Sequence, residues 1–204
     1  MATPVADVPG FSVDWYRTIT DLAHASPEWV RTLAGVATEA VVIVLGLFVL
    51  ADLWRNRRAT PRAKAFAVAA PALTVLAYGI SEFAKLAAEQ DRPCRAVRGI
   101  AATISECPAL GDFSLPSNHT TIATAAAVGL AISWRRIAAL VLPLAPLEAF
   151  LRVYVGVHYP HDVLVGLVLG TTVVVFGTAV LHLLLVRRDA PLPHAGPAPT
   201  KPAS

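Results

Sequence analysis

The sequence predicts an all-α membrane protein, a polytopic transmembrane helical bundle with five predicted spans and an N-terminal interfacial amphipathic helix. Composition is the first reason: of the 204 residues, 55% are hydrophobic and only 15% are charged, whereas about a quarter of the residues in a soluble domain are charged. Length is the second reason, because four apolar stretches approach or reach the ~20 residues that cross a bilayer. Such long, uncharged segments would leave the helices of a soluble bundle without a polar face.

The positions of these stretches give the predicted spans. The four long stretches cover residues 33–53, 63–88, 137–153 and 163–186. A fifth stretch, 118–133, covers only ~24 Å at 1.5 Å per residue, so we expect it to start in the interface or in a pit. Pro143 and Pro146 should bend the span in which they lie.

The two ends of the chain are expected to differ from this core. Residues 11–30 mix aromatic and aliphatic side chains with charged ones. This pattern is typical of an amphipathic helix in the membrane interface, where Trp and Tyr are favoured. Residues 1–10 lack the basic start of a signal peptide, and residues 189–204 are too rich in proline to fold. We therefore predict one membrane domain over 11–188, between a disordered N-terminus and a disordered tail.

Basic residues predict the orientation, because loops rich in Lys and Arg stay cytoplasmic. They occupy the first connection, the third connection and the segment after the last span: Arg55, Arg57, Arg58, Arg62, Lys64, Arg135, Arg136, Arg187 and Arg188. Five spans with those three ends inside place the N-terminus outside and the C-terminus inside the cytoplasmic (inner) membrane. The loops 89–116 and 154–162 then face outside.

The outside loop 89–116 is itself basic, with Arg92, Arg95 and Arg98. An anionic substrate would explain this exception to the orientation rule. The sequence pI of about 9.1 comes mostly from the cytoplasmic residues, so we expect no nucleic-acid partner.

Cys94 and Cys107 are the two cysteines of the chain, and both lie in this outside loop. An oxidising compartment would permit a disulfide between them. Two free thiols are the alternative, and the sequence leaves both possibilities open because it does not give the distance between the Cα atoms.

Three short clusters at the outer ends of the spans carry candidate chemistry. The first is Lys85 with Arg92, which precedes Pro93. We expect the helix to end in the polar residues between the two cations, with Arg92 extended before the proline. An ammonium and a guanidinium group together bind a tetrahedral anion well. A snorkelling lysine and a solvated arginine would look the same in sequence.

The second cluster opens the short apolar stretch and consists of Pro116, Ser117, Asn118 and His119. Ser117 is a natural N-cap. The free N–H groups of a first helical turn form an anion site at the positive end of the helix dipole. His119 lies inside this turn, where a bound phosphate would favour its charged form. A helix cap with an incidental histidine is the alternative.

The third cluster is Arg152, His158 and Asp162. Pro160 between the last two is tolerated in the first turn of a helix. Such a helix places the Asp162 carboxylate one turn from His158, where it can accept the Nδ1–H and leave Nε2 as a nucleophile. We expect His161 to point elsewhere. Glu148, one turn before Arg152, is expected to pair with it and fix the guanidinium group.

Together, Lys85-x6-Arg92-Pro93, Pro116-Ser117-Asn118-His119 and Arg152-x5-His158-x3-Asp162 resemble the three signature motifs of the type 2 phosphatidic acid phosphatase family. That family also includes vanadium-dependent haloperoxidases. The resemblance covers residues 85–162. Asn118 stands where the family usually has Gly, and Leu151 stands where it usually has Ser. Residues 153–160 look especially like the bacterial polyprenyl-diphosphate phosphatases of this family.

The resemblance implies a role for each site residue. It implies that His158 attacks phosphorus and becomes a phosphohistidine, that Asp162 orients it, and that His119 protonates the leaving oxygen and then activates water. It also implies that the phosphate oxygens are held by Lys85, Arg92, Ser117, Asn118 and Arg152. No metal and no other cofactor is implied, because ammonium and guanidinium groups can neutralise the phosphate.

We therefore expect a metal-independent membrane phosphatase that hydrolyses a lipid phosphate or diphosphate on the outer face, with a polyprenyl (undecaprenyl-type) diphosphate as first choice. Phosphatidic acid, phosphatidylglycerol phosphate and a prenyl-phosphoryl sugar phosphate are alternative substrates. A lipid phosphotransferase with the same phosphohistidine is an alternative activity. A non-catalytic lipid-binding or transport protein is the alternative from another class, but it predicts broken motifs. Headgroup, chain length and oligomeric state stay open at this point.

Overall fold

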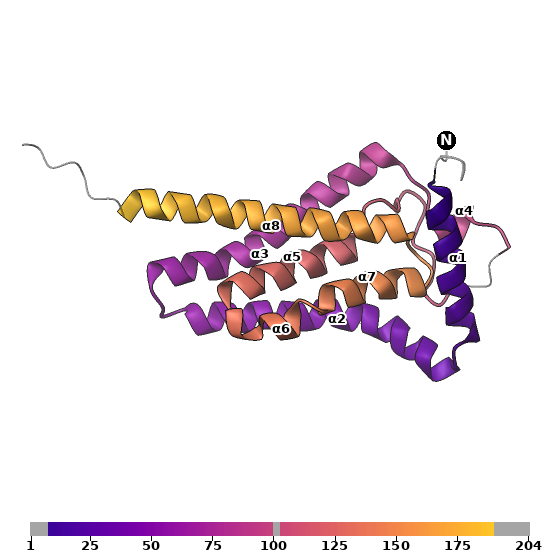
Figure 1. The fold of residues 1–204 in the computed structure, drawn as a ribbon, viewed down its shortest axis with the longest axis horizontal. Helices are drawn as coiled ribbons and strands as arrows, with labels where there is room; N and C mark the ends of the chain where they lie inside the picture. Colours follow the sequence, from indigo (N-terminus) through magenta and orange to yellow (C-terminus); the bar gives the residue numbers. More distant parts are fainter. Residues whose placement is uncertain (1–7, 100–102, 190–204) are drawn as a thin grey trace, which may run out of the picture.

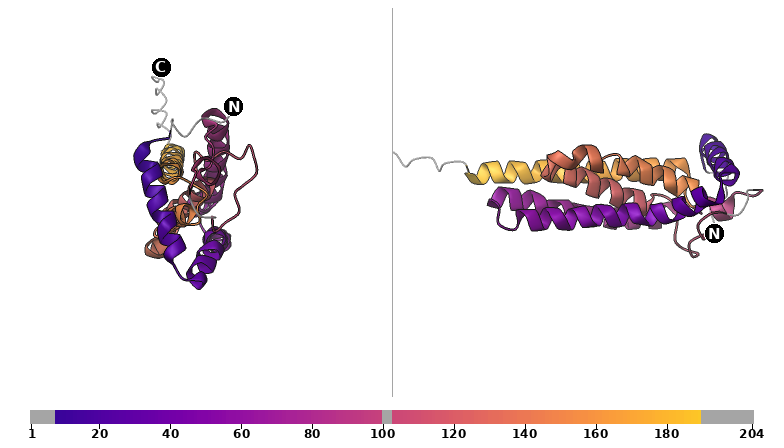
Figure 2. Two further views of the ribbon diagram at one scale, coloured as in Figure 1. Left: turned by 90° about the vertical axis from the view of Figure 1, so that its right-hand side faces the viewer. Right: turned by 90° about the horizontal axis from the view of Figure 1, so that it is seen from below.

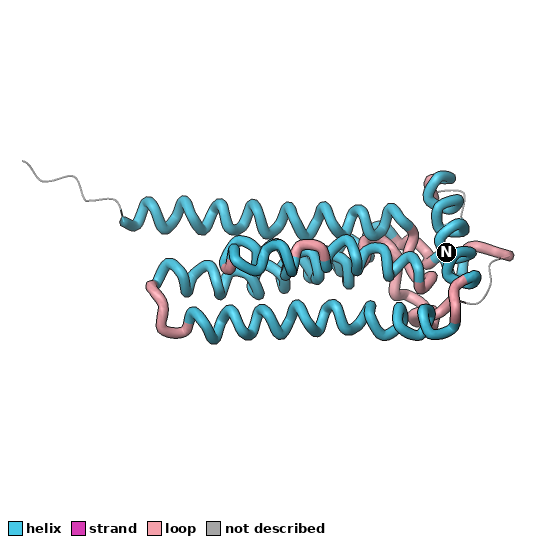
Figure 3. Tube along the Cα trace, turned by 60° about the horizontal axis from the view of Figure 1, so that its bottom comes forward, coloured by secondary structure: helices cyan, strands magenta, loops and turns pink. Residues whose placement is uncertain are grey.

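The computed structural model describes residues 8–99 and 103–189, and this part of the chain consists of helices and loops without a strand (Figure 3). The predicted all-α fold is confirmed. The disordered ends predicted for residues 1–10 and 189–204 lie almost wholly outside the described residues. The helices are α1 (Gly10–Ala25), α2 (Glu28–Asn56), α3 (Pro61–Ala88), α4 (Pro93–Ala96), α5 (Asn118–Ser133), η2 (Arg135–Ile137), α6 (Ala138–Val141), α7 (Leu144–Tyr154) and α8 (Pro160–Asp189).

Helix α5 forms the centre of the bundle, because α2, α3, α7 and α8 all pack against it (Figure 1). Its inner residues are small, and Ala123, Ala125 and Ala127 are fully buried. Small side chains let neighbouring helices approach closely: a Cβ on Gly129 would lie 2.9 Å from the Cβ of Ala70 on α3. A helix that its neighbours cover does not need the length of a lipid-facing span.

Four helical segments are long and apolar enough to cross a membrane, namely Glu28–Asn56, Pro61–Ala96, Arg135–Tyr154 and Pro160–Arg188. Large hydrophobic side chains on these segments face outward, with Val75, Phe83 and Phe176 strongly exposed, as expected of surfaces that contact lipid. The chain is therefore a multi-pass membrane protein. With 16 residues, α5 is shorter than the four segments, and the count of five spans stays a prediction.

The span predicted over 137–153 is interrupted, as its prolines led us to expect. Helix α6 ends at Val141, and α7 begins at Leu144, directly after Pro143. A proline removes a backbone donor and crowds the preceding turn, so the chain bends between α6 and α7 and continues toward the same end of the bundle (Figure 1).

The N-terminal helix is shorter than predicted and lies across the end of the bundle (Figures 1 and 2). The expectation of one helix over 11–30 was wrong, because α1 ends at Ala25 and Trp29 already belongs to α2. Ser26 has an extended backbone before Pro27, the conformation that a following proline favours. The helix has one exposed and one buried face, since Trp15 is 63% exposed and Tyr16 is fully buried.

The basic connections and the three clusters lie at opposite ends of the bundle. The α2–α3 connection, the turn after α5 and the end of α8 lie at one end (Figure 1). There the Arg62 Nη2 atom lies 2.9 Å from His182 Nδ1, and Arg55 donates a hydrogen bond of 3.3 Å to the Ser133 carbonyl. Helix α1 and the loops that carry the three clusters lie at the opposite end (Figure 1). The loops that carry the three clusters are therefore separated from the basic connections by the length of the bundle.

Candidate active site

The three clusters meet in one cavity of ≈ 390 Å³ at the α1 end of the bundle. Two other predicted site residues, Ser117 and Asp162, are fully buried beside it. Six of the predicted site residues lie on the wall of the cavity: Lys85, Arg92, Asn118, His119, Arg152 and His158.

The first two clusters have the backbone conformations that the sequence predicted. Helix α3 ends after Ala88, with Lys85 in its last turn, and Arg92 is extended (ψ 145°) before Pro93. The Ser117 hydroxyl accepts from the Thr120 N–H and caps α5. The Ser117 oxygen is therefore used to orient the first turn of α5. The contact of Ser117 with a phosphate stays a prediction.

The start of α5 is also tied to α3. The Ser81 hydroxyl donates a hydrogen bond of 2.7 Å to Asn118 Oδ1, and the Asn118 amide group donates to Glu82. Glu82 in turn lies 3.6 Å from Lys85 Nζ. The helix start that carries His119 and the helix end that carries Lys85 are therefore held in one arrangement.

His158 and Asp162 form the predicted pair. The His158 Nδ1 atom lies 3.4 Å from Asp162 Oδ2, and α8 begins at Pro160 between the two residues. On the other side of the ring, Arg92 Nη1 lies 3.0 Å from His158 Nε2. A guanidinium group only donates hydrogen bonds, so Nε2 must carry the lone pair and Nδ1 the proton. This is the tautomer that a nucleophilic Nε2 requires.

The Asp162 carboxylate is fully buried and is held by several donors, as a buried charge requires. The Tyr159 N–H donates a hydrogen bond of 2.8 Å to it, the Gln90 amide group donates one of 2.9 Å, and the Ser114 hydroxyl donates as well. These contacts leave the carboxylate no freedom to rotate away from His158. The carboxylate is therefore fixed beside His158, as the predicted role of Asp162 in orienting that ring requires.

The environment of His158 keeps its ring neutral. Burial lowers the pKa of His158 to about 3, and the nearby Arg92 charge acts in the same direction, while the hydrogen bond to Asp162 opposes them. A histidine in water has a pKa near ~6.5. The Nε2 atom thus stays unprotonated at neutral pH, with its lone pair accepting from Arg92.

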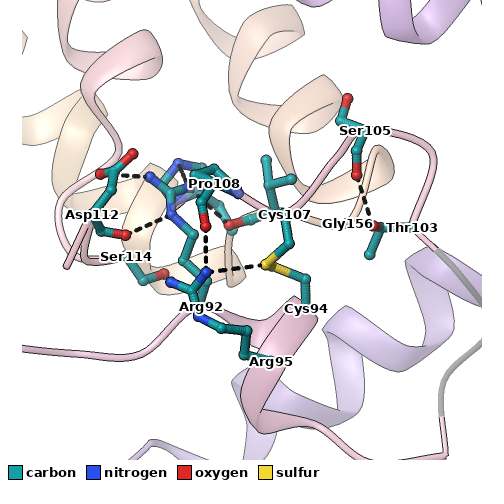
Figure 4. The surroundings of a disulfide bond; sticks show 12 residues. Arg92, Cys94, Arg95, Thr103, Ser105, Cys107, Pro108, Asp112, Ser114 and Gly156 are labelled. Carbon is teal, nitrogen blue, oxygen red and sulfur yellow. Dashed lines mark hydrogen bonds and ion pairs between the residues drawn. A yellow bond between two sulfur atoms is a disulfide. The ribbon is translucent and has the colours of Figure 1, made fainter. Parts of the chain in front are cut away.

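Lys85 and Arg92 share an acidic partner that the sequence analysis did not identify. Lys85 Nζ lies 2.7 Å from Asp112 Oδ1. Arg92 Nη2 lies 2.9 Å from the same oxygen (Figure 4). Arg92 Nε also donates a hydrogen bond of 2.9 Å to the Asp112 carbonyl oxygen. Partial burial acts to raise the pKa of Asp112, but the hydrogen bonds and charges of Lys85 and Arg92 outweigh it and hold that pKa below its usual value. One carboxylate oxygen thus lies between two cations, where a phosphate oxygen would also be stabilised.

The loop that carries Asp112 is tied back to α4. Cys94 and Cys107 form a disulfide with Cα atoms 6.0 Å apart (Figure 4), which decides the alternative that the sequence left open. Arg95 on α4 donates a hydrogen bond to the Pro108 carbonyl oxygen on the same loop. The sequence offered the two cysteines as a signal for this closure, but nothing in it pointed to Asp112.

His119 and Arg152 share a second acidic residue that the sequence analysis missed. His119 Nε2 lies 3.2 Å from Glu39 Oε1, and Arg152 Nη1 lies 3.8 Å from the same atom. Glu39 falls inside the apolar stretch 33–53. A carboxylate within a predicted span is a functional candidate by default, so the signal was present in the sequence.

Glu148 does not contact Arg152 directly, so the predicted ion pair was wrong in detail. Thr38 on α2 stands between them: Arg152 Nη1 donates a hydrogen bond of 3.2 Å to the Thr38 hydroxyl, which donates one of 2.9 Å to Glu148. All three residues are buried. Glu148 still acts on the guanidinium group, but through the hydroxyl.

His161 does not point away from the site as expected. Its Nε2 atom lies 3.2 Å from Asp162 Oδ1 and 3.0 Å from Gln90 Oε1, and its Nδ1 atom lies 2.8 Å from the Ser12 hydroxyl of α1. The ring stacks on Tyr159 at 5.5 Å between centroids. The expectation failed because α1, which is far away in sequence, supplies the partner that turns the ring.

Comparison with known proteins gives a family. The model of the PAP2 superfamily matches residues 66–185, which is more than half of the chain and contains every cluster described above. The chain belongs to the PAP2 superfamily. The membrane phosphatase predicted from the motifs is thereby confirmed at the level of the family.

Two curated relatives share part of the sequence. The decaprenylphosphoryl-5-phosphoribose phosphatase of Mycobacterium tuberculosis (strain CDC 1551 / Oshkosh) is 48% identical over 63 residues, which are 30% of this chain and 33% of that protein. The undecaprenyl-diphosphatase of Sulfolobus acidocaldarius is 36% identical over 100 residues, which are 48% of this chain and 46% of that protein. The matched regions thus span between a third and about half of these relatives.

Two solved structures share the fold. The crystal structure of Aquifex aeolicus LpxE has a TM-score of 0.63 at 20% identity and covers 87% of this chain and 99% of its own. The crystal structure of the PAP2-type phosphatidylglycerolphosphate phosphatase from Bacillus subtilis has a TM-score of 0.62 at 17% identity, with coverage of 88% and 90%. At these identities the likeness concerns the fold alone.

Proposed function

We propose that this protein removes the terminal phosphate of a polyprenyl-linked lipid through a phosphohistidine at the outer face of the cytoplasmic membrane. The observation that carries the proposal is the His158 ring, whose Nδ1–H is directed at Asp162 and whose Nε2 lone pair faces Arg92. A nucleophile beside a cation pair, within one cavity that also holds a second histidine, is suited to phosphoryl transfer.

In the proposed first step, His158 Nε2 attacks phosphorus, the bond to the leaving oxygen breaks, and His119 gives that oxygen a proton. In the second step, neutral His119 takes a proton from water, the water oxygen bonds to phosphorus, and the N–P bond breaks to release phosphate. Lys85, Arg92 and Arg152 neutralise the oxygens in both steps. Asp162 stabilises the positive ring of His158 without taking its proton.

The choice of a polyprenyl-linked substrate rests on the two curated relatives, whose names refer to a decaprenylphosphoryl phosphoribose and to undecaprenyl diphosphate. A polyprenyl diphosphate is the substrate that the sequence motifs favoured. A prenyl-phosphoryl sugar phosphate is the second candidate, supported by the 48% identity to the mycobacterial phosphatase. In both substrates a terminal phosphate is joined to a unit that a long prenyl chain anchors in the membrane.

The proposed orientation rests on charge. The basic connections gather at the end of the bundle away from the cavity, and basic loops stay cytoplasmic. The cavity then opens at the outer surface, with the N-terminus outside and the C-terminus inside.

The test is phosphate release by purified protein from a panel of polyprenyl diphosphate, prenyl-phosphoryl sugar phosphate, phosphatidic acid and phosphatidylglycerol phosphate. We expect turnover of the polyprenyl-linked substrates, an acid-labile phosphorylated intermediate with labelled substrate, and loss of both in His158→Gln. His182→Gln, at the other end of the bundle, is the matched control. Turnover that persists in a folded His158→Gln protein would refute the phosphohistidine, and turnover of phosphatidic acid alone would refute the polyprenyl substrate.

A further inference from the structure

Glu39 is a carboxylate in the cavity to which the two proposed steps assign no role of its own. It lies on α2, inside a segment long enough to cross a membrane, and it lines the cavity. Its side chain is 64% exposed, so no packing against the bundle explains its presence. Charged residues in such segments are costly and mark pathways or binding sites.

The carboxylate is directed at the general acid. His119 Nε2 lies 3.2 Å from Glu39 Oε1 and 3.4 Å from Oε2. Phosphoryl transfer requires the attacking and leaving atoms to lie roughly in line on opposite sides of phosphorus. With His158 as nucleophile and His119 as proton donor, the leaving oxygen must approach His119 and therefore also Glu39.

Glu39 is compensated by His119, which is protonated when it acts as the acid, and in part by Arg152. Arg152 Nη1 lies 3.8 Å from Glu39 Oε1, but the same nitrogen donates to the Thr38 hydroxyl. The two other cations on the cavity wall are engaged elsewhere, since Lys85 and Arg92 both contact Asp112. The leaving-group side of the cavity thus carries a carboxylate beside His119 and Arg152, whereas on the nucleophile side Asp112 is shared by two cations.

We propose that Glu39 forms a hydroxyl-binding subsite for the leaving group and selects phosphomonoesters of a sugar or polyol unit on the lipid over diphosphates. This inference rests on the proposed function and reverses the order of its two candidate substrates. A hydroxyl group on the leaving unit can donate a charge-assisted hydrogen bond to Glu39. The leaving group of a diphosphate is a second phosphate, which has no donor to offer at neutral pH and brings a like charge beside the carboxylate.

The test compares two substrates that share one prenyl chain, farnesyl diphosphate and farnesyl-phosphoryl-ribose 5-phosphate, in detergent micelles. The measured quantity is the ratio of the two kcat/KM values. The wild-type protein should prefer the sugar phosphate, and Glu39→Gln should shift the ratio toward the diphosphate by roughly ten- to a hundredfold, the scale of a like-charge contact. Glu39→Asp, which keeps the charge, should retain the wild-type preference.

Glu28→Gln is the matched control, because it removes the same charge from the first turn of the same helix. Its ratio should equal that of the wild type. An unchanged ratio in a folded Glu39→Gln protein, or a wild-type preference for the diphosphate, would overturn the subsite. Failure of the wild-type protein to release phosphate from either substrate would instead overturn the proposed function.

Discussion

Asp112 lies between Lys85 and Arg92 at the position that we assign to a substrate phosphate oxygen, so the removal of its charge should strengthen anion binding. Asp112→Asn keeps the size of the side chain and the backbone carbonyl that accepts from Arg92 Nε. It replaces a carboxylate oxygen that lies 2.7 Å from one cation and 2.9 Å from the other. We expect a lower KM for substrate and a lower inhibition constant for inorganic phosphate.

The magnitude follows from these two contacts. A hydrogen bond to a charged group contributes about 1.5–3 kcal/mol. The Asp112 side chain is 44% exposed, and solvent screening at such a site reduces the whole contact to roughly 1–2 kcal/mol. Since 1.4 kcal/mol is about tenfold in an equilibrium constant, the inhibition constant should fall about five- to thirtyfold. The pKa of Asp112 lies below its usual value, so the carboxylate stays ionised and competes through mildly acidic pH.

The assay is competitive inhibition of aryl phosphate hydrolysis by inorganic phosphate, with purified protein in detergent. Asp91→Asn removes the same group from a neighbouring position that is not part of the cavity wall, and it should leave the inhibition constant unchanged. Weaker phosphate binding in a folded Asp112→Asn protein would refute the reasoning. In that case Asp112 would serve to hold the two cations in place for the substrate.

The other predictions concern the catalytic groups, the metal and the orientation. His158→Ala should abolish all turnover. His119→Ala should reduce hydrolysis of an aryl phosphate less than that of a lipid phosphate, because general acid catalysis contributes ~10²–10⁴-fold and a good leaving group needs less of it. Equal losses on both substrates would contradict the role of His119 as general acid. Asp162→Asn should lower kcat by up to ~10⁴-fold, and His161→Ala should lower it less. If His161→Ala lowers kcat more in a folded protein, the pairing of His158 with Asp162 is wrong. Activity should survive EDTA and be blocked by vanadate; activity that is lost in EDTA and restored by Mg²⁺ would refute the metal-free assignment. A single cysteine at Leu110, with Cys94 and Cys107 replaced, should react with an impermeant thiol reagent in intact cells; reaction only after lysis would place the cavity inside.

The features that the sequence predicted correctly are those with a local cause. Ser117 caps α5 because a serine before a helix start accepts a backbone N–H of the first turn. Pro160 begins α8 because its fixed φ suits that position, and this alone puts Asp162 one turn from His158. The ends of the apolar stretches likewise predicted that the three clusters lie at one end of the bundle. Each of these conclusions needs no more than a few neighbouring residues.

The features that the sequence did not predict depend on contacts between distant segments. Ser114 and Gln90 reach Asp162 from a long loop, and no spacing in the sequence links them to it. The turn of the His161 ring depends on Ser12, which is 149 positions away. Glu39 had a visible signal as a charge in an apolar stretch, but its contact with His119 follows only from the packing of α2 beside α5.

The loop that carries His158, the proposed nucleophile, is held from several directions. Gly156 has a positive φ of 89°, and a Cβ there would lie 2.6 Å from the Thr103 side chain. The Tyr16 hydroxyl of α1 donates a hydrogen bond of 2.9 Å to the Gly156 carbonyl oxygen, and the Ser105 N–H donates one of 3.3 Å to Val155. Helix α1 and the disulfide-closed loop therefore both contact the loop that carries His158. Precise placement of a reactive group requires such support from a second layer of contacts, and here it comes from the two segments that lie outside the bundle of long helices.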